Sequence, residues 1–213
     1  MGTGRVPFGS LTALLRAVPV SPEDPGTAAL MERLRAVRRA GEFDRAAFLA
    51  MCRWKSPRAL LHYRRHSAAT VRRVARAVLA TRSERRRLAL LTALRGVSVP
   101  TASAILTLIE PRRYAVLDIR VWQLLHALGA VEACPAGRGF GATHWEQFLR
   151  LLRAQARALG ITPRLVELTL FHYHRTVQTG RLYEPARPAG RRRNPIPVRA
   201  APPRKSGRPS HTR

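Results

Sequence analysis

The residues whose types and spacing could support chemistry lie in the segment 94–125. Gly96 stands between two apolar runs with helical spacing, 88–94 and 101–109. Pro100 suits the first turn of the second run, because its fixed φ fits a helix and its missing N–H would have no partner there. A tight turn that leads into a helix leaves backbone N–H groups pointing outward beside the positive end of the helix dipole. The segment therefore predicts an anion-binding turn.

The charge of the chain indicates which anion to expect. The formal net charge is +27, which is far more than solubility requires. A polyanion is the economical partner for such a chain. We therefore expect the turn to bind nucleic-acid phosphates, with an affinity that falls as salt is added.

An isolated acid, Asp118, follows the turn at a distance that allows the two to meet. Nine helical residues from 101 to 109 advance about 14 Å, and the eight residues from 110 to 117 span at most roughly 28 Å. The chain can therefore bring Asp118 back to the side of the turn. By pattern alone Asp118 is typical of a helix N-cap, for a second helical run that stops at Gly129.

This segment resembles the helix-hairpin-helix DNA glycosylases, the HhH-GPD superfamily that includes endonuclease III and the adenine and 8-oxoguanine glycosylases. The family hairpin reads roughly Leu-Pro-Gly-Val-Gly-x-x-Thr-Ala. Matching positions are occupied by Leu94, Gly96, Val97, Thr101 and Ala102. In the family an apolar stretch then ends in a single Asp at a helix start, as Val116 and Leu117 lead into Asp118 here. The likeness is specific over about thirty-five residues and extends as a helical pattern over roughly residues 27–178.

The resemblance implies a role for Asp118 as the catalytic carboxylate that stabilises a positively charged sugar while the bond to the base breaks. Capping and catalysis are compatible, because N–H donors keep the pKa of a carboxylate low and its charge present. Pro100 occupies the place where bifunctional relatives carry a lysine that attacks the sugar. The implied reaction is therefore hydrolysis of the N-glycosidic bond of a damaged or mispaired base, without strand cleavage.

The resemblance also implies a DNA-binding set around the hairpin: Gly96, Val97, Ser98, Val99, Thr101 and, beside the acid, Arg120. Ser98 departs from the family, where a second glycine lets the backbone approach a phosphate. An ordinary helix–helix turn is the alternative interpretation of the hairpin. For Arg120, an exposed surface arginine is the alternative.

A base-flipping enzyme also needs a pocket for the extruded base. Trp54, Tyr114 and Tyr173 are the aromatic candidates, although aromatic residues at helical spacing are more often part of a core. Lys55 follows Trp54 and is the only lysine before the C-terminal tail. It could serve as a Schiff-base amine, but we favour a solvated or phosphate-contacting lysine.

Helical periodicity predicts an all-α fold, because no alternating strand pattern occurs before residue 130. We expect two helical halves with an intervening cleft, in a domain that covers residues 27–180 after an N-terminal lead, 1–26. Expected helix starts include Asp44, Ser56-Pro57, Ser67, Ser83, a Thr143–Glu146 capping box and Thr162-Pro163. We expect Gly180 to end the folded part. Residues 181–213 combine arginine and proline with one acid, Glu184, and predict a disordered basic tail.

The cysteine content and the apolar runs indicate the cellular environment to expect. Two cysteines, Cys52 and Cys134, cannot form an iron–sulfur or zinc site alone and suggest a reducing compartment. No apolar run reaches membrane-spanning length, and no signal-peptide order appears at the N-terminus. We expect a cytoplasmic monomer, nucleoid-associated if bacterial, that binds double-stranded DNA without a metal or organic cofactor and without a membrane.

Two other functions remain open. A non-catalytic helix-hairpin-helix DNA-binding module would keep the hairpin without a working pocket, and Ser98 favours it. An RNA- or ribosome-associated basic protein would explain the tail but not the order of hairpin and Asp118.

Overall fold

The computed structural model describes residues 6–179 and residue 182 of the chain. Within this part the fold is all-α, with no strand, as the sequence predicts. The helices are α1 (Leu11–Ala17), α2 (Pro25–Ala40), α3 (Arg45–Lys55), the 3-10 helix η1 (Pro57–Ala59), α4 (Leu60–Tyr63), α5 (Ala68–Ala80), α6 (Glu84–Thr92), α7 (Val99–Ile109), α8 (Ile119–Ala127), α9 (Ala142–Leu159) and α10 (Pro163–Val177). The predicted stop at Gly180 and the predicted tail lie outside the described residues.

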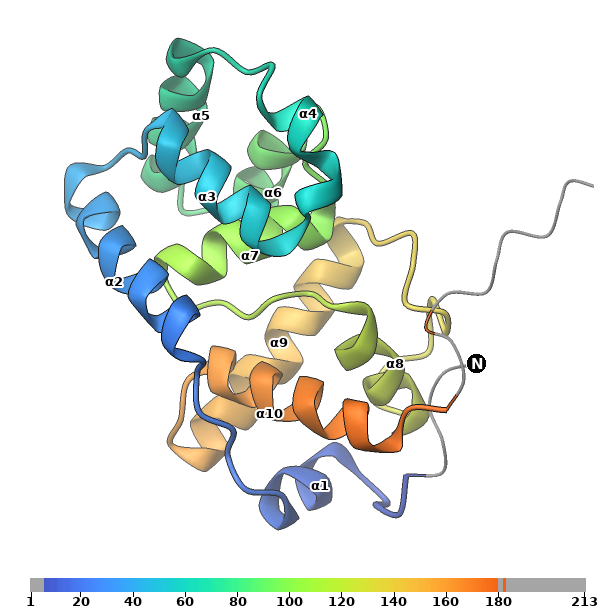
Figure 1. Ribbon diagram of the computed structural model, residues 1–213. Coiled ribbons are helices and arrows are strands. Elements are labelled where there is room, and N and C mark those ends of the chain that lie inside the picture. The colour runs from blue at the N-terminus through green and yellow to red at the C-terminus, as the bar shows by residue number, and fades with distance from the viewer. Residues whose placement is uncertain (1–5, 180–181, 183–213) are drawn as a thin grey trace, which may run out of the picture. The chain divides into compact units, whose positions relative to one another are not determined.

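The helices form two groups, with α7 between them (Figure 1). One group consists of α3, α4, α5 and α6, and the other of α1, α8, α9 and α10. α7 packs against α2, α3 and α6, whereas α10 packs against α8, α9 and α1. The prediction of two helical halves is confirmed. The N-terminal lead joins the same compact unit, because Leu11, Leu14 and Leu15 are buried in the core.

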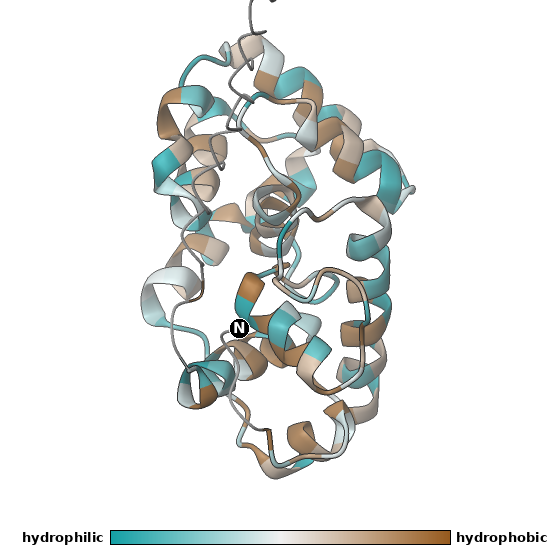
Figure 2. Cartoon of the chain, turned by 90° about the vertical axis from the view of Figure 1, so that its right-hand side faces the viewer, coloured by the Kyte–Doolittle hydropathy of each residue, from teal (hydrophilic) through white to brown (hydrophobic). Residues whose placement is uncertain are grey.

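α7 is the central helix because it is apolar on every face. Its residues from Thr101 to Ile109 are all buried. The other long helices are amphipathic, and hydrophobic and hydrophilic stretches alternate along them in Figure 2. On α5, for example, Val71, Ala75 and Val78 are buried. The described part of the chain contains no helix with the length and apolarity that a bilayer span requires.

Side-chain caps fix most helix starts. The predicted N-caps Asp44, Ser67, Ser83 and Thr162 each accept a hydrogen bond from a backbone N–H in the first turn of their helix. Ser56 stands at the predicted position before the next helical segment, with Pro57 in the first turn, but its side chain makes no capping hydrogen bond. Its backbone N–H donates to the Cys52 carbonyl and ends α3, so the segment that follows is only the 3-10 helix η1 and the short α4.

The predicted capping box at Thr143 and Glu146 is wrong. The helix α9 begins at Ala142, and the backbone N–H of Gly141 donates to Nδ1 of His144 at 3.0 Å. The extended backbone of Gly141 allows the helix to begin earlier than the Thr143 pattern indicates. Glu146 instead accepts two hydrogen bonds from the Arg85 guanidinium on α6.

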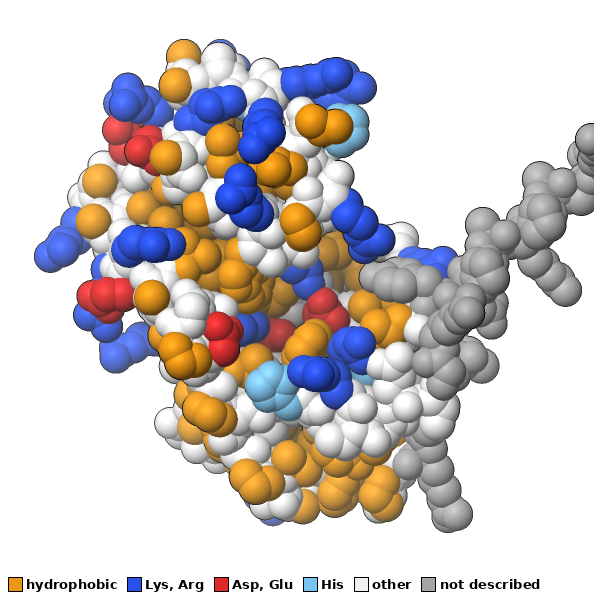
Figure 3. Space-filling model, in the orientation of Figure 1, with side chains coloured by type: hydrophobic (Ala, Val, Ile, Leu, Met, Phe, Trp, Pro, Cys, Tyr) orange, Lys and Arg blue, Asp and Glu red, His pale blue; other side chains and the backbone are white. Residues whose placement is uncertain are grey.

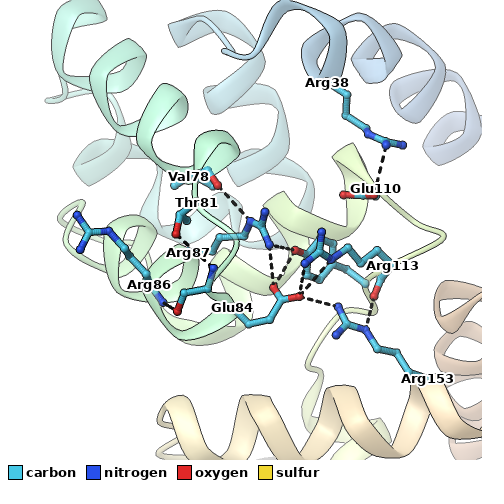
Figure 4. Close-up of polar contacts among 11 residues, drawn as sticks. Arg38, Val78, Thr81, Glu84, Arg86, Arg87, Glu110, Arg113 and Arg153 are labelled. Atoms are coloured by element: carbon cyan, nitrogen blue, oxygen red, sulfur yellow. Dashed lines mark hydrogen bonds and ion pairs between the residues drawn. The ribbon is translucent and has the colours of Figure 1, made fainter.

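A charged cluster around Glu84 ties the two groups of helices together (Figure 4). The carboxylate of Glu84 on α6 accepts hydrogen bonds from Arg113, which precedes α8, and from Arg153 on α9. Tyr114 donates its hydroxyl to the same carboxylate at 2.8 Å. Arg87 donates to the Tyr114 oxygen at 3.1 Å. The cluster fixes the chain at the point where it leaves α7 and turns back toward Asp118.

Candidate functional site

The turn before α7 needs a glycine for two reasons. Gly96 has a φ of +89°, in the left-handed region that disfavours residues with a Cβ. A Cβ at this position would lie 2.7 Å from Cβ of His62 and 3.3 Å from the Tyr63 ring. The turn is closed by the Val97 N–H, which donates to the Leu94 carbonyl at 2.9 Å. The hairpin is therefore packed tightly against α4.

Ser98 is the N-cap of α7. Its Oγ accepts a hydrogen bond from the Thr101 N–H, and its φ of −83° lies outside the left-handed region. A second glycine is therefore not required by the backbone here. Among the described residues, the backbone N–H groups of Gly96, Ser98 and Val99 have no hydrogen-bond acceptor. These three donors are available to an anion.

Two members of the predicted DNA-binding set cannot make such contacts. The side chains of Val97 and Thr101 are buried, and their backbone N–H groups donate to Leu94 and Ser98. They shape the hairpin from inside the core. The sequence pattern that identifies a hairpin does not separate residues that build it from residues that face a ligand.

Asp118 is the N-cap of α8, as predicted. Its Oδ1 accepts a hydrogen bond from the Arg120 N–H at 2.9 Å. Its Oδ2 accepts one from Nζ of Lys55 at 2.5 Å. The Asp118 side chain is 15% exposed, so the carboxylate is held on two sides and still reaches the surface.

Ser103 connects the hairpin with the acid. Its Oγ accepts a hydrogen bond from the backbone N–H of Leu117 at 2.9 Å, and its hydroxyl donates to the Pro100 carbonyl at 2.8 Å. The residue before Asp118 is thus bonded to the first turns of α7. The predicted return of the acid to the hairpin side of the molecule is confirmed.

Lys55 is not the solvated lysine that we expected. It is the last residue of α3, its side chain is 17% exposed, and it forms an ion pair with Asp118. Sixty-three positions separate the two residues, and only the packing of α3 beside the start of α8 brings them together. The sequence contains one sign that Lys55 is special, namely that it is the only lysine before the tail.

A second buried charged group lies on α10. Glu167 is 2% exposed and accepts a hydrogen bond from Arg164, which in turn donates to both carboxylate oxygens of Glu23. Burial raises the pKa of Glu167 to about 7; Arg164 opposes this rise and the charge of Asp118 adds to it. Lys55 also acts to lower this pKa. The sequence interpretation missed this acid, which its spacing on a helix does not distinguish from a surface residue.

Arg120 donates its backbone N–H to Asp118, but its side chain points away from this carboxylate. The guanidinium donates to Gln178 and lies 5.7 Å from the centre of the Phe171 ring. Burial and the charge of Arg120 lower the pKa of His174 to about 4, while Asp118 opposes this shift. His174 is therefore neutral at physiological pH.

The three aromatic pocket candidates are placed differently from one another. Trp54 lies beside the charged groups, with its indole N–H on Thr27 and the Arg164 guanidinium 5.5 Å from its ring. Tyr114 is 1% exposed and its hydroxyl donates to Glu84, so most of its ring packs in the core, and its role in a base pocket stays a prediction. Tyr173 packs edge-on against Phe8 of the N-terminal lead.

One face of the molecule is hollowed. Figure 3 shows a depression between the upper and lower groups of helices, with acidic and basic side chains set among hydrophobic ones. Within the described residues, no three His, Cys, Asp or Glu side chains are arranged to hold a metal ion. What the Asp118 site offers chemically is a carboxylate with a neighbouring amine.

An exposed surface on α4 adjoins the hairpin, and we call it the α4 patch. Leu61 is 74% exposed, the most of any large hydrophobic side chain in the described part of the chain. Exposed basic and histidine residues lie near Leu61 in the chain or on the hairpin that contacts α4: Arg58, His62, Arg64, Arg65 and Arg95. Basic, histidine and hydrophobic side chains gather at this corner in Figure 3. The sequence interpretation did not single out Leu61, because it predicted a longer helix there.

Known proteins supply no relative for this arrangement, since no protein-family model, no curated protein and no solved structure matches the chain. The geometry of the site therefore carries the functional inference.

Proposed function

We propose that this chain is a DNA glycosylase-like enzyme that binds duplex DNA as a monomer, flips a damaged or mispaired base and hydrolyses its N-glycosidic bond. The observation that carries the proposal is the position of Asp118. Its carboxylate caps α8, remains 15% exposed, and is bonded through Ser103 and Leu117 to the helix that bears the hairpin. The chain at Asp118 is thus tied to the helix whose N-terminal turn offers three backbone N–H donors that suit a phosphate.

The chemistry follows from the charge of Asp118. As the bond between the sugar C1′ and the base nitrogen breaks, its electron pair leaves with the base and positive charge develops on the sugar. A fixed carboxylate stabilises that charge without reorganisation. Water then forms the new bond at C1′, one of its protons is released, and the base nitrogen takes up a proton. The products are a free base and an intact strand with an abasic site.

The hairpin and the α4 patch together suit the DNA backbone. The N–H groups of Gly96, Ser98 and Val99 can bind one phosphate, and the exposed arginines of the patch can neutralise neighbouring ones. Leu61 projects from the same surface. An exposed apolar side chain is suited to fill the space that a flipped base leaves in the duplex.

A second candidate reaction is favoured by one observation, the position of Lys55 against Asp118. A neutral amine here could attack C1′, form a Schiff base with the opened sugar and lead to strand cleavage. Pro100, at the hairpin, offers no such amine. The ion pair holds Lys55 as an ammonium, which supports hydrolysis by water as the first candidate.

The test is base release from duplexes that carry uracil, alkylated, oxidised or mismatched bases. Strand breaks are scored before and after alkali, and a parallel reaction contains borohydride. Alkali-dependent breaks without a borohydride-trapped complex support hydrolysis. A trapped complex that is lost in Lys55→Met supports the amine reaction. Duplex binding with no release would favour the non-catalytic DNA-binding module, and preference for RNA in competition would favour an RNA-associated protein.

A further inference from the structure

A cavity of about 430 Å³ borders the end of α7 that is opposite the hairpin. Its wall contains one carboxylate, Glu110, and four arginines that come from α2, α5, α6 and the segment after α7. Aliphatic side chains of α5 and α7 line the same space. We call this space the arginine cavity, and its arginines are Arg38, Arg76, Arg87 and Arg113. Neither Asp118 nor Lys55 lines it, so it is separate from the Asp118 site.

Positive charge exceeds negative charge beside the arginine cavity. Arg87, Arg113 and Arg153 all pair with the single carboxylate of Glu84. These three positive charges against one negative charge leave an excess of two. The other two arginines of the cavity each have a carboxylate partner of their own and add no excess. Because a charge held away from water is costly unless it is paired, this excess favours an anionic ligand.

Arg87 is the arginine whose charge is least compensated. Its side chain is 9% exposed, and it meets Glu84 at 3.4 Å, compared with 2.8 Å for Arg113 and 3.0 Å for Arg153. Its Nε donates to the Val78 carbonyl and so offsets the partial negative charge at the end of α5 (Figure 4). Its Nη2 donates to no described residue, and it is not among the fully buried atoms that lack a partner. This nitrogen is therefore open to the cavity that Arg87 lines.

The other three arginines of the cavity also have donors to spare. Arg38 meets Glu110 at 3.4 Å through Nη2 and makes no hydrogen bond with a described residue. Arg76 donates to its surface carboxylate through Nε, and Arg113 donates to its shared carboxylate through Nε and Nη2. Each guanidinium thus keeps at least one nitrogen for a ligand. Such groups bind phosphate oxygens through pairs of parallel hydrogen bonds.

We propose that the arginine cavity binds a phosphate monoester. A monoester carries about two negative charges at neutral pH, which matches the excess of two positive charges. The cavity volume lies within the range of small-molecule sites, roughly 300–1,000 Å³, so an organic body fits beside the phosphate. Leu79, Leu106 and Ile109 provide apolar contacts for that body. The phosphate belongs either to a free mononucleotide or to the 5′ end of a nucleic-acid strand.

The experiment is calorimetric titration of the full chain with thymidine 5′-monophosphate in about 0.15 M salt, with thymidine as the phosphate-free control. We expect saturable binding of one nucleotide per chain and no binding of thymidine. Arg38→Met should weaken nucleotide binding about tenfold, because it removes charge-assisted hydrogen bonds. Arg86→Met removes the same charge from an exposed neighbour of Arg87 that does not line the cavity. It should change the affinity by no more than about twofold.

A change of opposite sign is expected at Glu110. Glu110→Gln removes the carboxylate that lines the cavity and should strengthen nucleotide binding about threefold or more. Arg87→Lys keeps the charge but loses the guanidinium donors, and should weaken binding about tenfold. If Arg87→Lys does not fold, Arg38→Met and Glu110→Gln decide, since both side chains are partly exposed. Equal weakening in Arg38→Met and Arg86→Met, or an unchanged affinity in Glu110→Gln, would overturn the proposal.

Two duplexes of one sequence, with 5′-phosphate or 5′-hydroxyl ends, distinguish the two sources of the phosphate. For a strand end, the phosphorylated duplex binds more tightly and Arg38→Met abolishes the difference. For a free nucleotide, the two duplexes bind equally and only the mononucleotide affinity responds to Arg38→Met. Absence of binding by both the mononucleotide and the phosphorylated end would overturn the proposal. None of these outcomes depends on base release at Asp118.

Discussion

Nζ of Lys55 lies 2.5 Å from Oδ2 of Asp118, and both side chains are largely buried. The contact joins the end of α3 to the start of α8 and so links the two groups of helices. It is the one place where a primary amine meets a carboxylate in the part of the chain that the structure describes. Stability, chemistry and charge at this site therefore depend on each other.

Removal of the amine should destabilise the protein. Lys55→Met leaves the Asp118 carboxylate with its Arg120 N–H bond but without a counter-charge, and we expect the free energy of unfolding to fall by roughly 1–3 kcal/mol. Arg76→Met is the matched control, because Arg76 forms an equally short pair with Glu42 on the surface. Its loss should cost about 0.5 kcal/mol or less. Equal losses in urea unfolding of the two variants would contradict the structural role of Lys55.

The hairpin glycine should not tolerate a Cβ. Gly96→Ala combines a positive φ with a 2.7 Å contact to His62, so we expect a loss of at least about 2 kcal/mol in thermal or urea unfolding. Gly129→Ala provides the control, since Gly129 also has a positive φ but open space around it. It should cost about 1 kcal/mol. A Gly96→Ala protein as stable as Gly129→Ala would show that the turn is not packed against α4.

Leu61 should contribute to base release from duplex DNA but not to the stability of the fold. Because its side chain is 74% exposed, Leu61→Ala should change the free energy of unfolding by no more than about 0.5 kcal/mol. If Leu61 fills the gap left by a flipped base, single-turnover base release should fall about tenfold. Val20→Ala, at the second large exposed apolar residue among those described, should release base at the wild-type rate. Identical rates for all three proteins would remove Leu61 from the interface.

Glu84 should contribute to the acid sensitivity of the fold. Burial acts to raise its pKa, but hydrogen bonds from Tyr114, Arg113 and Arg153 outweigh this and hold the pKa below its ordinary value near 4.5. A depressed pKa means that the stabilisation is fully present above 4.5 and is lost as pH falls through the folded-state value. Glu84→Gln should therefore flatten the decline of unfolding free energy between about pH 5 and pH 3. Glu32→Gln, at a surface pair with Arg35, should keep the wild-type decline.

The sequence predicts much of this fold because residues close together in the chain determine where most helices begin. Ser67 and Asp44 cap helices through bonds to residues three positions on, and a pattern over so few residues is visible without coordinates. Gly141 shows the limit, because its cap depends on the His144 ring, which no standard motif includes.

The candidate site was predictable in part. The sequence predicts Asp118 because this acid follows the hairpin and its helix, and it predicts Gly96 because a glycine separates two helical runs. The ion-pair partner of the acid was not predictable, because Lys55 reaches Asp118 only through the packing of α3 beside the start of α8. The hydrogen bond of the Tyr114 hydroxyl was not predictable for the same reason, because its partner Glu84 lies thirty positions away in the chain.

The measurement that tests the central claim most directly compares Asp118→Asn with Asp44→Asn on a duplex from which the wild type releases a base. Both substitutions change an N-cap aspartate to asparagine, which retains capping. We expect Asp118→Asn to lose base release by at least about 100-fold while its duplex affinity stays within about threefold of wild type, and Asp44→Asn to retain release. Release at the wild-type rate by Asp118→Asn would contradict the role of this carboxylate, and with it the proposed function.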